Sequence, residues 1–83
     1  MKVQVKYFAS VREALGTGGE TTETNATTVA DLRNELIARD LQHAECLGRG
    51  KTIRVALNQT LCDEAACLFD GAEVAFFPPV TGG

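Results

Sequence analysis

The sequence predicts an α+β domain in which one main helix lies across one face of a mixed β-sheet. Apolar and polar residues alternate near the start of the chain and again in its last third, as they do in half-buried strands. A helical apolar stripe lies between these segments. With 83 residues, the chain is long enough for one domain.

The first strand is expected over residues 2–9, where the alternation is regular. Its two faces carry Val3, Val5 and Tyr7 on one side and Lys2, Gln4, Lys6 and Phe8 on the other. Ser10 and Glu13 have the spacing of a capping box. This spacing predicts a short helix over residues 11–15, which Gly16 ends.

The second strand and the main helix follow a glycine-rich turn. Gly18 and Gly19 allow the chain to turn into a Thr/Glu-rich strand over residues 20–24, which we expect at an edge of the sheet. Thr28 is the expected N-cap of a helix over residues 29–39. The apolar stripe of this helix consists of Val29, Leu32 and Leu36.

The last strands are separated by turn signals. Residues 53–57 alternate, and the Asn-Gln pair at residues 58–59 indicates a tight turn. An Asp-Gly turn then precedes a last strand over residues 73–77. This order fits a β-grasp fold, with the first and last strands side by side in the centre of the sheet. Residues 1–77 form the expected domain, and residues 78–83 form a flexible C-terminal tail.

The tail has the composition of a narrow stalk. Pro78 and Pro79 cannot donate to a sheet ladder, so they end the last strand. Gly82 and Gly83 have no side chain and can pass through a channel too narrow for other residues. We therefore expect the tail to place the Gly83 carboxylate inside the active site of another protein.

Two aromatic side chains are expected on the outer face beside this tail. Phe8 lies on the polar face of the first strand, and Phe77 points away from the core face that holds Val74 and Phe76. If the first and last strands are neighbours, Phe8 and Phe77 lie close together. An exposed aromatic pair at the root of a protruding tail indicates a docking surface.

Composition and charge exclude several classes of protein. The net charge is −3 and the basic residues are scattered, so the chain has no basic stripe for nucleic acid. It has no apolar run of membrane-spanning length and no signal-peptide core. Cys46, Cys62 and Cys67 lack CxxC spacing, which argues against a disulfide framework or a zinc site. Cys62 and Cys67 are expected to be small apolar fillers, and the expected compartment is a reducing cytoplasm.

The residues indicate no catalytic group. His43 is the only histidine and lies in the polar segment 40–45, so a solvated loop residue is expected rather than a general base. Asp63 and Glu64 are expected in a solvated bend. The glycine-rich residues 16–19 lack the Lys-Ser/Thr of a phosphate-binding loop. The chain is therefore not expected to be an enzyme by itself or to bind a cofactor.

The end of the chain carries a resemblance to a known family. Residues 70–83, with their Phe-Phe-Pro-Pro-Val-Thr-Gly-Gly ending, resemble the C-terminal part of the molybdopterin synthase small subunits. The similarity continues in residues 7–13 and residues 58–61, whereas residues 41–51 carry no matching motif. The resemblance implies a ubiquitin-like β-grasp protein that carries sulfur as a C-terminal thiocarboxylate during molybdenum cofactor synthesis.

The resemblance also implies a reaction sequence at Gly83. An ATP-using activating enzyme converts its carboxylate into an acyl-adenylate, and a sulfur donor then displaces AMP. In the family, the tail inserts into the large subunit, where the thiocarboxylate attacks the cyclic pterin precursor to build the dithiolene. Catalytic bases are expected on the large subunit, and Gly82 is needed for passage. The guided stalk would consist of Pro78, Pro79, Val80 and Thr81.

Partners follow from the same resemblance. The implied assembly is a heterotetramer of two small and two large subunits, and a ubiquitin-activating-like adenylyltransferase is the second partner. The implied docking face includes Phe8, Leu61 and Phe77, and the alternation of the strands selects the first and last of these independently. The acidic balance of the chain is compatible with basic surfaces on the partners.

Other functions remain open from the residues alone. A thiamine-type sulfur carrier shares the fold and the Gly-Gly end, and a ubiquitin-like modifier would join Gly83 to lysines of target proteins. A β-grasp interaction module with an inert tail is a further alternative. The Phe-Phe-Pro-Pro-Val-Thr stretch favours the molybdopterin synthase family over the thiamine type. The few lysines, Lys2, Lys6 and Lys51, disfavour a polymeric modifier.

Overall fold

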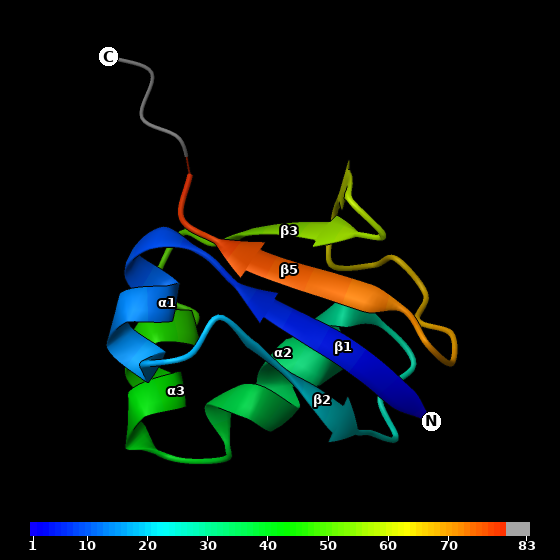
Figure 1. The fold of residues 1–83 in the computed structure, drawn as a ribbon, viewed down its shortest axis with the longest axis horizontal. Coiled ribbons are helices and arrows are strands. Elements are labelled where there is room, and N and C mark those ends of the chain that lie inside the picture. The colour runs from blue at the N-terminus through cyan, green and yellow to red at the C-terminus, as the bar shows by residue number, and fades with distance from the viewer. Residues whose placement is uncertain (80–83) are drawn as a thin grey trace.

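The strands form one five-stranded sheet in the order β2-β1-β5-β3-β4 (Figure 1). The computed structural model describes residues 1–79. The strands are β1 (Lys2–Tyr7), β2 (Gly19–Glu23), β3 (Arg54–Leu57), β4 (Thr60–Cys62) and β5 (Glu73–Phe77). The helices are α1 (Ala9–Leu15), α2 (Val29–Ile37) and α3 (Leu41–Leu47). β1 and β5 are parallel neighbours at the centre, and the other pairings are antiparallel, which confirms the predicted β-grasp fold with its mixed sheet.

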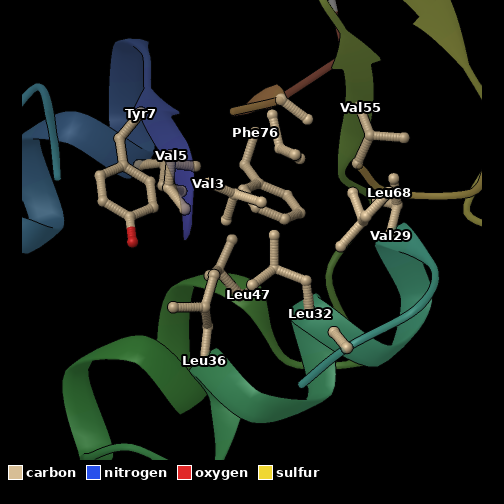
Figure 2. Packing of buried hydrophobic residues seen from close by; sticks show 14 residues of the cluster. Val3, Val5, Tyr7, Val29, Leu32, Leu36, Leu47, Val55, Leu68 and Phe76 are labelled. Carbon is tan, nitrogen blue, oxygen red and sulfur yellow. The ribbon is translucent and has the colours of Figure 1, made fainter. Parts of the chain in front are cut away.

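The hydrophobic core lies between one face of the sheet and the helices. Tyr7 and Phe76 are fully buried there, and Figure 2 shows Leu32, Leu36 and Leu47 reaching up toward the sheet residues. The alternation in the first and last strands therefore assigned the core face correctly. The sheet side chains of this core are Val3, Val5, Tyr7, Val55, Val74 and Phe76.

The other face of the sheet is turned toward the viewer in Figure 1, and no helix of residues 1–79 crosses it. We call it the open face. α2 passes behind the sheet in the same view, and α1 and α3 lie together beside it. Within residues 1–79, no helix is long and apolar enough to cross a membrane.

The main helix begins and the short helix ends at the residues that the sequence indicates. Gly16 adopts the left-handed conformation (φ 72°) at the end of α1, and its N–H donates to the Arg12 carbonyl at 2.9 Å. Thr28 caps α2, because its Oγ1 accepts a hydrogen bond from the Asp31 N–H at 3.2 Å. α2 ends at Ile37, two residues earlier than the sequence suggests.

The capping box predicted at Ser10 is wrong. α1 begins at Ala9, so Ser10 lies inside the first turn of the helix. The N-cap is Phe8, which has extended backbone and makes no side-chain capping hydrogen bond. The Phe8 carbonyl accepts the first helical hydrogen bond, from the Val11 N–H at 3.2 Å. The strand and the helix are thus joined at Phe8 itself.

The segment after α2 differs most from the prediction. Instead of a polar loop, it forms α3, with Asp40 as the N-cap whose Oδ1 accepts from the His43 N–H at 2.8 Å. His43 lies on the inner side of this helix and is only 8% exposed. The prediction of a solvated loop histidine is therefore wrong, because a short capped helix turns the imidazole toward the core.

The loop between α3 and β3 is held by a buried arginine. The Arg33 guanidinium donates to the carbonyls of Leu47 (2.7 Å) and Gly48 (2.9 Å) and pairs with Glu64 at 2.9 Å. Glu64 also binds Arg49. Burial acts to raise the pKa of Glu64 but is outweighed by the hydrogen bonds and charges of Arg49 and Arg33, so the pKa is lowered overall. Glu64 is thus a structural ion-pair residue and not the solvated one expected.

The predicted turns are confirmed. Asn58 and Gln59 both have positive φ (48° and 67°), the conformation of a tight two-residue hairpin turn between β3 and β4. Gly71 has φ 84° in the turn before β5. These two turns place β4 at one edge of the sheet and return the chain to its centre.

Candidate functional site

The open face has a floor of small side chains at its centre. Ala56 lies directly opposite Ala75 on β5 and opposite Leu61 on β4, and Ala75 lies opposite Lys6 on β1. Directly paired residues share a face of the sheet. Ala56 and Ala75 are 8% and 7% exposed, whereas Leu61 is 66% exposed. The floor is therefore apolar, and the Leu61 side chain projects above it at the β4 edge.

A shallow hollow at one end of this floor brings the two predicted aromatic residues together. Phe8 and Phe77 both line it, with Ala56, Ala75 and Pro78 among the other lining residues. Its volume is about 410 Å³. Phe8 is 48% exposed, and its N–H donates to the Phe76 carbonyl at 3.2 Å, which fixes its position beside β5. Phe8 and Phe77 are thus neighbours on the outer face, as predicted, but Phe77 is half-buried rather than exposed.

Leu61 lies on the same face but in a different hollow. It lines a neighbouring depression at the β4 edge together with Arg54 and Asp63. The structure thus places Phe8 and Phe77 together and Leu61 one strand away, across Ala56. The three residues can still contact one partner, because all three border the Ala56–Ala75 floor.

The tail leaves the domain beside this hollow. β5 ends at Phe77, and Pro78, which follows, is half-buried in the wall of the hollow. Pro79 is the last residue that the structure describes. Val80, Thr81, Gly82 and Gly83 lie outside the described residues, so their predicted roles rest on the sequence.

Ala56 and Gln59 are lining residues that sequence reasoning missed. Neither side chain carries a chemical group that points to binding, and Ala56 lies in an ordinary alternating strand. Only the register of β3 against β5 places Ala56 beside the tail. A sequence signal did exist for Gln59, since the Asn-Gln turn positions it, but the turn does not indicate which face it borders.

A second group of titratable residues lies on the core side and connects several elements. The Tyr7 hydroxyl donates to Glu20 Oε2 at 3.1 Å, and Arg39 pairs with Glu20 Oε1 at 2.5 Å. His43 Nδ1 lies 2.8 Å from Asp40 Oδ1, and its Nε2 lies 3.9 Å from Glu20 Oε2. Burial first, and then Glu20, raise the pKa of Tyr7 far above its ordinary value. This network ties β1, β2 and α3 together and does not reach the open face.

The residues that the structure describes form no metal centre, and two of the three cysteines have raised pKa values. Within residues 1–79 no group of His, Cys, Asp and Glu is arranged to hold a metal ion. Burial raises the pKa of the Cys46 and Cys62 thiols, which makes them poorer nucleophiles at neutral pH. Cys62 packs against the core as expected, whereas Cys67 is exposed, so the prediction that Cys67 fills the core is wrong.

Comparison with known proteins adds the family context. The model of the ThiS family matches residues 5–83. The molybdopterin synthase sulfur carrier subunit of Escherichia coli (strain K12) is 44% identical over 81 residues, covering 98% of this chain and 99% of the relative. The subunit of the same name from Haemophilus influenzae is 38% identical, with the same coverage.

Solved structures show the same fold. The crystal structure of SAMP1 from Haloferax volcanii superposes with a TM-score of 0.78 at 25% identity and full coverage of both chains. A chain in the protein–protein complex of subunits 1 and 2 of the molybdopterin-converting factor from Helicobacter pylori superposes with a TM-score of 0.70 at 27% identity, again over both full lengths.

Proposed function

This chain belongs to the ThiS family, and we propose that it is the sulfur-carrier small subunit of a molybdopterin synthase. The observation that supports the proposal is that the hollow lined by Phe8 and Phe77 leads directly into the tail. β5 contributes Phe77 to the hollow and leads at once into Pro78 and Pro79, beyond which the sequence continues to Gly82-Gly83. A partner that covers the open face is thereby positioned to receive the tail.

The proposed chemistry is confined to Gly83. Its carboxylate attacks the α-phosphate of ATP on an activating enzyme, which forms an acyl-adenylate and releases pyrophosphate. A sulfur donor then displaces AMP and leaves a thiocarboxylate, whose sulfur is a better nucleophile than the oxygen it replaces. In the synthase, this sulfur attacks the cyclic pterin precursor on the way to the dithiolene. The chain itself holds no cofactor in this scheme, and ATP belongs to the activating enzyme.

The composition of the tail indicates which subunit supplies the catalytic groups. Because Gly82 and Gly83 carry no side chain, they contribute no acid or base, and the large subunit has to supply both. A narrow channel also keeps water away from the acyl intermediates. The chain is thus a sulfur-donating subunit and not the catalytic one.

A large synthase subunit is the partner that the comparisons support. The Helicobacter pylori relative was solved in a complex of subunits 1 and 2 of its converting factor. We further propose a heterotetramer of two small and two large subunits, and a ubiquitin-activating-like adenylyltransferase as the enzyme that charges Gly83. The cytoplasm is the proposed compartment, where Cys46, Cys62 and Cys67 would remain reduced.

A protein modifier is the second candidate function. The Haloferax volcanii SAMP1 structure superposes more closely than the Helicobacter pylori chain, with TM-scores of 0.78 and 0.70. A second structure from Haloferax volcanii is described as small archaeal modifier protein 1. In that function Gly83 would form an isopeptide bond with a lysine of a target protein. Both functions begin with the same acyl-adenylate, so the acceptor distinguishes them.

Intact mass spectrometry of the full chain tests the proposal. After incubation with ATP, the activating enzyme and a sulfur source, we expect a mass gain equal to the replacement of one oxygen by sulfur, localised to Gly83. Addition of the large subunit and the cyclic pterin precursor should reverse this gain. The matched control is the chain without Gly83, which should stay unchanged. Isopeptide-linked adducts without a sulfur gain would instead support the modifier, and no change at all would contradict both functions.

A further inference from the structure

Arg54 lies on the open face beside the hollow that Phe8 and Phe77 line, which we call the aromatic hollow. It is the first residue of β3 and lies directly opposite Phe77 in the antiparallel pairing of β3 with β5. Directly paired residues share a face, so the Arg54 side chain leaves the sheet on the side of Phe77. The next residue after Phe77 is Pro78, the root of the tail. Arg54 is thus a cation next to the point where the tail leaves the domain.

Arg54 differs from the arginines that hold the fold together. Arg33, Arg39 and Arg49 each form an ion pair with a glutamate. Arg54 is exposed and forms no ion pair or side-chain hydrogen bond within residues 1–79. Asp63 borders the same depression, but its Oδ1 accepts a hydrogen bond from the Ala65 N–H at 2.8 Å. Asp63 keeps a free carboxylate oxygen, and Glu64 also borders this depression, but neither pairs with the Arg54 guanidinium within residues 1–79.

A second cation lies on the other side of the apolar floor. Lys6 on β1 pairs with Ala75, so it shares the open face, and it forms no ion pair within residues 1–79. The acidic residues that the pairing of the strands places on this face lie further from the tail than the Lys6–Ala75 pair: Glu73 is opposite Gln4, and Glu23 is opposite Lys2. The end of the face nearest the tail therefore carries Lys6 and Arg54 without a neighbouring carboxylate in the cross-strand pairs.

This local charge is opposite in sign to the net charge of −3. The net charge alone suggests a basic partner. The rate at which two proteins associate and the orientation in which they bind depend, however, on the charges that face the partner. Arginine binds carboxylates in a planar two-point geometry, which adds orientation to attraction. A carboxylate on the partner, next to the apolar patch that receives Phe77, would both attract the Arg54 guanidinium and fix the orientation of the two proteins.

We propose that Arg54 is a specificity-determining contact of the docking surface, which pairs with a carboxylate of the large synthase subunit beside the entrance for the tail. This inference rests on the proposed function, because it names the large subunit as the partner. It adds a charged contact to an otherwise apolar face. The charge selects partners that present an acidic group at this position and speeds their encounter.

The experiment compares Arg54→Glu, Arg54→Gln and a control, Lys2→Glu, in association kinetics with the purified large subunit at low and high salt. Lys2→Glu changes the net charge by the same amount at the other end of β1. We expect Arg54→Glu to slow association by about 3- to 10-fold at low salt, with a smaller effect at high salt. Arg54→Gln should fall between Arg54→Glu and the native chain, and Lys2→Glu should stay close to the native chain.

The outcomes separate the inference from the function on which it rests. Equal slowing by Arg54→Glu and Lys2→Glu would show an effect of net charge and would overturn the inference while the proposed function stands. Native rates for Arg54→Glu and Arg54→Gln would overturn it as well. Absence of binding by the native chain would overturn both. Melting temperatures of all variants show whether slowed association comes from a folded protein, and Arg54→Gln provides a neutral variant if Arg54→Glu unfolds.

Discussion

Ala56 on β3 lies directly opposite Ala75 on β5, and both methyl groups belong to the open face, where they are 8% and 7% exposed. Two alanines at this point leave room for a partner to approach the sheet closely beside Phe77. A larger side chain here would hold the partner away from the hollow without entering the core, since the core faces the other side.

Ala56→Glu is therefore expected to prevent docking and to leave the fold intact. We expect binding to the large subunit to weaken by about 2 kcal/mol or more, because the longer side chain conflicts sterically with the partner and its carboxylate has to be desolvated. Thr60→Glu is the matched control, since Thr60 is exposed on the opposite side of the neighbouring strand. Titration calorimetry measures both affinities. Equal losses for the two variants would show that the open face is not the docking surface.

Phe77→Ala tests the aromatic hollow. Phe77 is half-buried on the open face, so its removal should weaken binding to the large subunit by about 1–3 kcal/mol if it is a hot spot. The melting temperature should change little. Phe76→Ala is the contrast, because Phe76 is fully buried and its loss should cost about 3–5 kcal/mol of folding stability. A large drop in the melting temperature of Phe77→Ala would show that the ring belongs to the core.

The fold was predictable from the sequence where one pattern dominates a segment. Alternation in β1 and β5 identified the core face, and the Thr28 cap and the apolar stripe identified α2. α3 was missed because its buried side is formed by one apolar residue, Leu47, and one polar residue, His43, so no apolar stripe marks the helix. His43 is buried because this short helix packs against the core, and the polarity of the histidine alone could not predict that burial.

The candidate site was predictable only in part, for a related reason. Phe8 and Phe77 could be assigned to the outer face because each follows a regular alternation. Ala56 and Arg54 belong to the same face through the register of β3 against β5. Register is set by the turns and by the whole sheet, so no local pattern indicates which residue lies opposite Phe77.

Gly82→Val tests the need for a narrow tail. We expect loss of sulfur transfer to the pterin precursor with an unchanged melting temperature, because the last strand of the domain ends at Phe77. Val80→Thr is the control, since it keeps a branched side chain of similar size where a side chain is already present. Product formation and intact mass are measured together. Native transfer by Gly82→Val would contradict the proposed passage of Gly82 through a narrow channel.

Arg33→Met tests the buried anchor of the loop before β3. Removing the guanidinium leaves the buried Leu47 carbonyl without its donor and takes one of two partners from Glu64, which keeps Arg49. We therefore expect a loss of about 2–4 kcal/mol in the free energy of unfolding. Arg39→Met is the matched control, because its pair with Glu20 is partly exposed and should be worth about 1 kcal/mol or less. Urea unfolding measures both. A similar loss for the two variants would contradict the anchoring role of Arg33.

The same ion pairs predict how stability depends on pH. The pKa of Glu64 is lowered in the folded protein, where Arg49 and Arg33 outweigh the effect of burial, so unfolding takes up a proton at pH values between the folded and unfolded pKa. The stability that the Glu64 ion pairs contribute is fully present above the ordinary glutamate pKa of about 4.3. It is lost as the pH falls through the lowered pKa of Glu64 in the folded protein. Urea unfolding between about pH 7 and pH 3 should show stability falling below about pH 4.5. Glu64→Gln should be less stable than the native chain at neutral pH and should lose less stability on acidification. An equally steep acid loss in Glu64→Gln would assign the pH dependence to other carboxylates.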